Sequence, residues 1–173
     1  MSAPDEPDEP EEPDEESPAD GHLAALRHHF ACARAERNGH AFARLAKERA
    51  FRRAVELLDP HARAVLDELD AGLLRGSGRV DGHPVSRLPD AGLHALWTLS
   101  WPAQADAGVD PVTLHAYYAA ALPLPLLCAG TVGDWPLAVV DAAQAAAARP
   151  VLRAAAAAEL LNLAQQAGPD LIP

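Results

Sequence analysis

Cysteine is scarce in this chain of 173 residues, which contains only Cys32 and Cys128. The two lie far apart in the sequence, so their spacing is neither that of a zinc-binding pair nor that of a disulfide framework. We expect both side chains to be reduced, buried thiols.

Long apolar runs are also lacking. The two most apolar stretches, residues 119–132 and 135–148, are interrupted by Pro123, Pro125 and Asp141. Both are shorter than the roughly 20 residues that cross a bilayer. The N-terminus is acidic and has neither the basic nor the apolar region of a signal peptide. We therefore expect a soluble, cytoplasmic protein with no membrane partner.

Motifs of common catalytic chemistry are missing as well. Gly76, Gly78 and Gly82 are not followed by the Lys-Ser or Lys-Thr pair that completes a phosphate-binding loop, and there is no nucleophile elbow. His61 and His115 each follow an Asp-Pro pair and could act as bases, although exposed first-turn residues of a helix have the same pattern. The sequence predicts no catalytic residue and no cofactor.

The acidity of the chain is concentrated at its start. Residues 1–20 hold 10 of the 25 acidic residues, five prolines, and no Lys, Arg, Leu, Ile, Val or aromatic residue. Such a segment cannot bury enough apolar surface to offset the entropy cost of ordering it. We predict a disordered acidic tail over residues 1–20 and one helical domain over residues 21–173, where 15 acidic and 14 basic residues nearly balance.

A basic stretch follows the tail directly. Residues 22–58 contain eight Lys or Arg but only three acidic residues. Because opposite charges that are close in sequence meet often, one hypothesis is that the tail folds over the basic helices and competes with an anionic partner. The other is that it only solubilises the protein. The candidate interaction residues here are Arg44, Lys47, Arg49, Arg52 and Arg53.

The rest of the sequence has helical periodicity. Asp59-Pro60 and Asp110-Pro111 are typical helix starts, because Asp caps a helix and Pro fits its first turn. We predict helices over residues 22–37, 40–58, 60–74, 89–100, 110–122, 135–148 and 151–167. The last two are expected to pack as an antiparallel hairpin. The predicted fold class is all-α: a single-domain array of six to seven short helices, as an orthogonal bundle or a helical-hairpin array.

The sequence predicts β structure in one segment, near residues 79–86. Asp81-Gly82 can form the turn of a minor β-hairpin with very short arms, and Pro84 would keep such a strand at an edge. With the helix over 60–74, this hairpin loosely resembles the helix and wing of a winged helix-turn-helix domain. The resemblance implies a small nucleic-acid-associated transcriptional regulator. The acidic helix and the near-neutral body argue against it.

A ladder of possible metal ligands lies in the first predicted helix. His28, Cys32, Glu36 and His40 follow one another at four-residue intervals. Each step of four drifts by roughly 40° around a helix, so the four cannot converge on one ion without a partner segment. The ladder continues with alternating charges, which is typical of a solvated, ion-paired helix face. We predict no bound metal and keep these four as the candidates.

A short pattern near the C-terminus joins Gly133, Asp134, Trp135, Ala138, Val139, Ala145 and Pro150. It resembles the second half of a tetratricopeptide repeat over about a tenth of the chain. Pro123 and Pro125 lie where the first helix of that repeat would run, and no second copy follows at its period of about 34 residues. The resemblance implies helical-hairpin packing and a role in binding peptides or proteins.

Three tryptophans are the largest apolar side chains. Trp97 shares its predicted helix face with Leu93 and Leu96, so we expect it in the core. Trp101 and Trp135 lie beside prolines at helix ends, where an indole either fills the core or stays half exposed as an interface anchor. Both are added to the interaction candidates.

Together these features predict a protein-interaction or adaptor module without catalytic activity; gating of its contacts by the acidic tail stays one of the two hypotheses for the tail. The expected partner is a protein of unknown identity, with a homodimer as a further prediction and nucleic acid as the less favoured partner. Two alternatives stay open: the nucleic-acid-associated regulator, and an enzyme whose site is not visible in the sequence.

Overall fold

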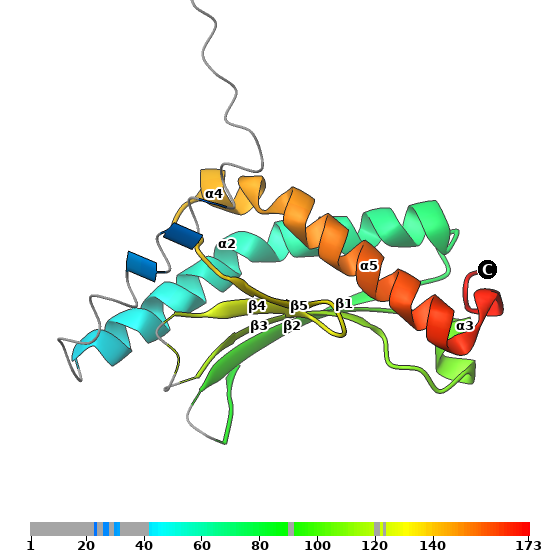
Figure 1. Ribbon diagram of the computed structural model, residues 1–173, viewed down its shortest axis with the longest axis horizontal. Coiled ribbons are helices and arrows are strands. Elements are labelled where there is room, and N and C mark those ends of the chain that lie inside the picture. Colours follow the sequence, from blue (N-terminus) through cyan, green and yellow to red (C-terminus); the bar gives the residue numbers. More distant parts are fainter. Residues whose placement is uncertain are drawn as a thin grey trace, which may run out of the picture.

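The computed structural model describes residues 23, 26, 27, 30, 31, 42–89, 92–119, 122 and 124–173. A long helix and a second helix near the C-terminus lie on one side of a five-stranded antiparallel sheet (Figure 1). The elements are α2 (Phe42–Leu73), β1 (Arg79–Arg87), β2 (Leu93–Ser100), α3 (Pro102–Asp106), β3 (Val112–Tyr118), β4 (Leu126–Ala129), β5 (Gly133–Pro136), α4 (Ala142–Ala147), α5 (Arg149–Ala167) and the 3₁₀ turn η2 (Pro169–Leu171).

The sheet has two different faces. Its strands are ordered β1-β2-β3-β4-β5, each antiparallel to the next. Buried and half-buried residues alternate along β2 and β3, because successive side chains of a strand point to opposite faces. The buried set packs against α2 and α5. The other set forms what we call the open face: His94, Leu96, Thr98, Thr113, His115, Tyr117, Leu126, Cys128, Asp134 and Pro136.

The core lies between the two long helices and the sheet. Phe51 and Leu58 of α2, Trp97 of β2, Leu114 of β3 and Leu152 of α5 are all at most 1% exposed. Burying side chains of this size contributes roughly 1.5–3 kcal/mol each. The expectation that Trp97 belongs to the core is confirmed.

The prediction of an all-α helical array was wrong. Residues 89–100 and 110–122, expected to be helices, contain β2 and β3 instead. In β2 the buried positions Leu93, Ala95, Trp97 and Leu99 alternate with half-buried ones. Leu93 and Trp97 are four residues apart, a spacing that fits either a strand or a helix. Ala95, between them, is too small to mark the alternation of large apolar residues that is typical of a strand. The pattern over residues 89–100 therefore fitted a helix as well as a strand.

The predicted break at Asp59-Pro60 is absent, and the helices expected over 40–58 and 60–74 form the single helix α2 with Pro60 inside it. Proline removes one hydrogen bond of the helix ladder. Tertiary contacts compensate locally: Leu58 and Ala62 are fully buried, and Asp59 Oδ1 accepts a hydrogen bond from Trp97 Nε1 at 2.8 Å. Asp59 therefore anchors the helix to the sheet and does not begin a new helix.

The β-hairpin expected near residues 79–86 was placed wrongly. Asp81 and Gly82 lie within β1, opposite Thr98 and Trp97 of β2. The hairpin of the protein is formed by β1 and β2 themselves. Its register shifts between His83 and Ser86, where Pro84 cannot donate to the ladder. β1 is an edge strand, which is where proline is tolerated.

The segment after β4 also differs from its prediction. In place of one helix over 135–148, the chain forms β5 and then α4, which Asp141 caps by accepting from the backbone N–H of Gln144 at 2.8 Å. Trp135 lies in a strand, so the resemblance to a tetratricopeptide repeat does not extend to the structure. The last predicted helix, over 151–167, corresponds to α5, which ends before Gly168 with φ 103°. It packs on α2 and the sheet, and the predicted α-hairpin is absent.

A buried carboxylate fixes the turn between β4 and β5. Glu159 of α5 is 4% exposed. Its Oε2 accepts hydrogen bonds from the backbone N–H and the hydroxyl of Thr131, both at 2.7 Å. A Cβ added to Gly130 would collide with this carboxylate. The turn and α5 are therefore held together through one side chain.

The two long helices have 32 and 19 residues. Charged side chains are spread along α2, and α5 carries Arg149, Arg153 and Glu159. Within the described part of the chain, no helix combines the length and the apolar character needed to cross a membrane.

Candidate functional site

The first half of α2 presents to solvent a surface that we call the basic face: Leu45, Arg49, Arg52 and Arg53. These residues lie on one side of the helix, because positions three and four apart are neighbours. Phe51, on the opposite side, is fully buried. Leu45 is 65% exposed, so the face combines one apolar side chain with three guanidinium groups. Three of the predicted interaction residues belong to it.

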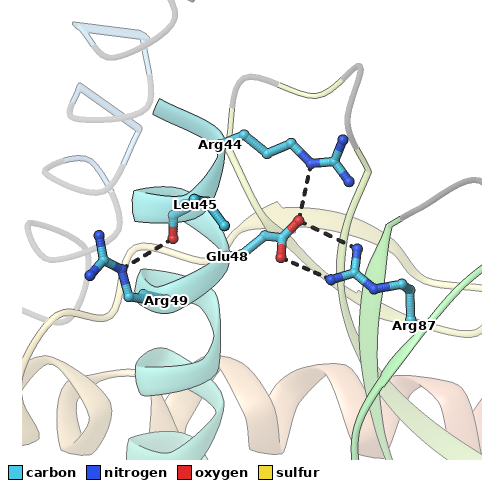
Figure 2. Close-up of polar contacts among 5 residues, drawn as sticks. All are labelled: Arg44, Leu45, Glu48, Arg49 and Arg87. Atoms are coloured by element: carbon cyan, nitrogen blue, oxygen red, sulfur yellow. Dashed lines mark hydrogen bonds and ion pairs between the residues drawn. The ribbon is translucent and has the colours of Figure 1, made fainter. Parts of the chain in front are cut away.

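Beside the basic face, Glu48 is held between two arginines (Figure 2). Arg87 Nη2 lies 3.0 Å from Glu48 Oε2, and Arg44 Nε lies 3.1 Å from Glu48 Oε1. Hydrogen bonds from Arg87 and then from Arg44 hold the pKa of Glu48 below its ordinary value of 4.5, so the carboxylate is ionised at neutral pH. Glu48 is 8% exposed and joins α2 to the end of β1. Arg44, another predicted interaction residue, is part of this structural group.

The guanidinium groups of the basic face are poorly neutralised. Arg53 Nη1 lies 3.5 Å from Glu56 Oε2, but both side chains are more than 60% exposed, and such surface pairs contribute little. Arg49 Nε donates to the Leu45 carbonyl at 3.4 Å (Figure 2). Arg52 has no ion-pair partner among the described residues. The first turn of α2 holds no acidic residue to offset the positive end of the helix dipole, so positive potential accumulates here.

A groove adjoins the basic face where α2 meets β1. It has a volume of about 470 Å³ and is lined by Arg52, Val55, Glu56, Asp59, Pro84 and Val85. The four α2 residues lie on successive turns, so the groove follows the helix for roughly 10 Å at 1.5 Å per residue. Val55, Pro84 and Val85 make its apolar part, and Arg52 joins it to the basic face. The sequence could not reveal it, because β1 and α2 meet only in the fold.

The open face of the sheet gathers a second group of titratable side chains. The rings of His94 and His115 lie 5.5 Å apart in a T-shaped arrangement, and the Tyr117 ring lies 5.2 Å from that of His115. Tyr117 Oη donates to Asp134 Oδ2 at 3.1 Å. Cys128 is paired in register with both His115 and Asp134. We call these five residues the sheet cluster.

The surroundings of three members of the sheet cluster, His115, Tyr117 and Cys128, favour the neutral form of each side chain. Burial, followed by the Asp134 carboxylate, raises the pKa of the Cys128 thiol to about 11. The same two causes raise the pKa of Tyr117. Burial and then the neighbouring His94 lower the pKa of His115, whose buried Nε2 has no hydrogen-bond partner among the described residues. A nucleophile needs a thiolate or a nearby base bonded to it, so this arrangement does not activate Cys128.

Sequence reasoning missed most of the sheet cluster. It interpreted His115 as an exposed first-turn residue of a helix, whereas His115 lies in the middle of β3 and is half-buried. His94, His115 and Cys128 each occupy a half-buried position that alternates with buried ones along its strand. Recognition of that alternation would have placed them on one face.

The remaining predicted residues are dispersed. Trp101 is 3% exposed, and its Nε1 donates to the Leu171 carbonyl at 2.7 Å. Trp135 is half-buried against the core, and Lys47 is partly buried on α2. The metal candidates His28, Cys32, Glu36 and His40 lie outside the described residues. Within the described ranges, no three His, Cys, Asp or Glu side chains are grouped to hold a metal ion.

The architecture of a winged helix is absent from the described part of the chain. Residues 60–74 belong to a longer helix packed on a sheet, and Asp81-Gly82 forms no wing. Comparison with known proteins adds no assignment, because no protein-family model, curated protein or solved structure matches this chain. Function must therefore be argued from the sites themselves.

Proposed function

We propose that this protein is a protein-interaction module that binds an acidic segment of a partner protein through the basic face of α2 and the adjoining groove. One observation carries the proposal: Arg49, Arg52 and Arg53 share one exposed helix face next to a groove with apolar walls. A surface with these two properties fits a chain that alternates carboxylates with apolar groups.

Each part of the surface has a distinct role. Arginine presents a planar fork of N–H donors that matches both oxygens of a carboxylate, so Arg49, Arg52 and Arg53 bind the acidic side chains. Leu45, Pro84 and Val85 contact the apolar groups of the partner. Glu48 keeps Arg87 and Arg44 in place and fixes β1 against the helix.

A nucleic acid remains the alternative anionic partner. The second half of α2 carries Asp59, Asp67, Glu68 and Asp70, and these carboxylates would repel a long phosphate backbone that follows the helix. A short acidic peptide on the basic face can avoid Asp67, Glu68 and Asp70, because this face spans little more than two helical turns. Glu56 and Asp59 line the groove itself, so only apolar groups of the partner enter it. This difference in charge distribution supports a peptide over a duplex.

The test uses a fluorescein-labelled decaglutamate peptide and a labelled 20-base-pair DNA duplex, with binding followed by fluorescence anisotropy at 50 and 150 mM salt. We expect the triple variant Arg49→Glu, Arg52→Glu, Arg53→Glu to weaken peptide binding at least tenfold. Arg79→Glu is the matched control, since Arg79 lies in β1, pairs only with Asp81 in the described structure and is 78% exposed. It should change binding less than twofold.

Other results would contradict the proposal. Equal weakening by the triple variant and by Arg79→Glu would show that net charge alone attracts the peptide. Tighter binding of the duplex than of the peptide at 150 mM salt would favour the nucleic-acid alternative. The predicted homodimer is a separate question, which size-exclusion chromatography with light scattering answers on the same samples.

A further inference from the structure

We propose that the open face of the sheet is the interface of a homodimer, in which a second copy of the chain packs face to face about a two-fold axis that runs along β3. The two long helices, α2 and α5, lie on the other side of the sheet (Figure 1). The inference is independent of the proposed function, because the basic face belongs to α2 and so to the opposite side of the molecule.

The middle of the open face is uncharged. Its three central strands, β2, β3 and β4, contain no Asp, Glu, Lys or Arg. Leu96 and Leu126 are half-buried on this face, and the surroundings of His115, Tyr117 and Cys128 favour their neutral forms. A protein interface is typically depleted of charge at its centre and enriched there in aromatic residues. The centre of the open face has this composition.

The edges of the open face carry complementary groups. Because residues directly opposite each other in a sheet share a face, the register places one row of side chains across all five strands: His83, Leu96, His115, Cys128 and Asp134. The row begins with an exposed imidazole on β1 and ends with an exposed carboxylate on β5. The best complement to this row is the same row reversed. A second copy of the chain provides it.

The direction of the two-fold axis follows from the same row. Rotation about an axis along β3 exchanges β1 with β5, so His83 of each copy faces Asp134 of the other, and the contact occurs twice. Rotation about an axis across the strands would instead place Asp134 opposite Asp134. Asp134 Oδ2 accepts a hydrogen bond from Tyr117 at 3.1 Å, and a carboxylate has further acceptor sites for an imidazole N–H. The axis along β3 therefore pairs the edges favourably.

The open face is large enough for a weak dimer. The five strands have four to nine residues. With strands about 4.8 Å apart and about 3.3 Å per residue, the face covers roughly 500 Å² per copy. Two copies would bury about 1,000 Å² together, which is near the lower limit for a specific interface. We therefore expect association at micromolar concentrations.

The first experiment measures the mass of the full chain by sedimentation velocity at increasing micromolar concentrations. The native protein should pass from monomer to dimer. Leu96→Lys places a charge at the centre of the open face and should weaken the dimer at least tenfold, because a buried unpaired charge opposes association. Leu161→Lys is the matched control, since Leu161 lies on α5 and is 57% exposed. It should change dimerisation less than twofold.

The second experiment tests the direction of the axis at the exposed edges of the sheet. Asp134→Lys and His83→Asp should each weaken the dimer, because each brings like or unpaired charges together. The double variant exchanges the two signs and should recover most of the lost affinity. This recovery tests the inference even if Leu96→Lys impairs folding. Circular dichroism and urea denaturation show which variants keep the native fold.

Three results would overturn the inference. A native chain that stays monomeric at every concentration has no such interface, and the proposed function is unaffected. A dimer that is lost in Leu161→Lys but kept in a folded Leu96→Lys variant uses the helices. A dimer that Asp134→Lys strengthens has Asp134 opposite itself, which contradicts an axis along β3.

Discussion

The two halves of α2 carry opposite charges and use them differently. In the second half, Asp59, Glu68 and Asp70 each accept hydrogen bonds from another element: an indole of β2, guanidinium groups of α5 and the backbone N–H that precedes β1. In the first half, Arg49 and Arg52 bind no carboxylate within the described residues. One helix thus holds structural anions at one end and uncommitted cations at the other.

This difference separates stability from binding. A charge that joins two elements is part of the fold, and its removal should destabilise the protein. A charged side chain that contacts no other helix or strand contributes little to the free energy of folding, and it is available to bind a partner. Glu48 is the exception in the first half, because it is buried and bound to two arginines.

The largest effect on stability is expected from Asp59→Ala. The change leaves the indole N–H of Trp97, which is 1% exposed, without its acceptor, and an unsatisfied buried donor costs about 1–3 kcal/mol. Urea denaturation should show a loss of that size. Asp67→Ala is the matched control on the same helix, because Asp67 is exposed, and it should stay within about 0.5 kcal/mol of the native protein. Equal losses would remove the distinction between the halves.

Glu48→Gln should have the next largest effect, about 1 kcal/mol at pH 7, because two charge-assisted hydrogen bonds weaken. The pKa of Glu48 is lowered in the fold by Arg87 and Arg44. Its ionised form therefore stabilises the protein above the unfolded-state pKa of 4.5, and this contribution is lost as pH falls through the lower folded pKa. Urea titrations between pH 7 and pH 3 should show the native and variant curves converging at the acidic end. A constant difference would contradict the assignment.

Glu68→Ala should have a smaller effect that depends on salt. Arg153 and then Arg149 lower the pKa of Glu68 by hydrogen bonding, and these contacts join α2 to α5. The three side chains are partly exposed, so added salt should screen the interaction. Thermal unfolding at 20 mM and 500 mM NaCl should show the native protein and the variant becoming more alike at high salt. A difference that grows with salt would be inconsistent with an ion pair.

The smallest effect on stability is expected from Arg49→Ala combined with Arg52→Ala. Neither side chain joins α2 to another described element, so urea denaturation should place the variant within about 0.5 kcal/mol of the native protein. Peptide binding by the same sample should nevertheless weaken. A large loss of stability would show that these arginines belong to the fold, and would weaken the case for a binding surface.

The sequence predicted α5, the core position of Trp97 and the basic stretch, because each depends on local pattern. It did not predict the sheet. Leu96 lies on the open face, opposite in direction to Leu93 and Trp97, yet all three coincide at helical spacing. Ala95 and Ala116 fill buried strand positions although alanine favours helices. Tertiary burial overrode these local preferences.

Residues that are typical of helix starts also led to a wrong prediction. Asp59-Pro60 has the chemistry of a helix start, but the role of Asp59 depends on Trp97, which is 38 residues further along the chain. The groove and the sheet cluster likewise join residues from separate elements. No local pattern records which strand will lie beside α2, so these features could be found only in the fold.

The strand order has a consequence for co-translational folding, that is, for folding while the chain is still being synthesised on the ribosome. Neighbouring strands are neighbours in sequence, so the sheet can assemble hairpin by hairpin as the chain emerges, with mostly short-range contacts. α5, however, covers part of β3 and β4 and is synthesised after all five strands. Until residues 149–167 appear, the apolar side of the nascent sheet lacks the cover that α5 gives to β3 and β4. We expect the chain to be most prone to aggregation, and most dependent on chaperones, during this interval.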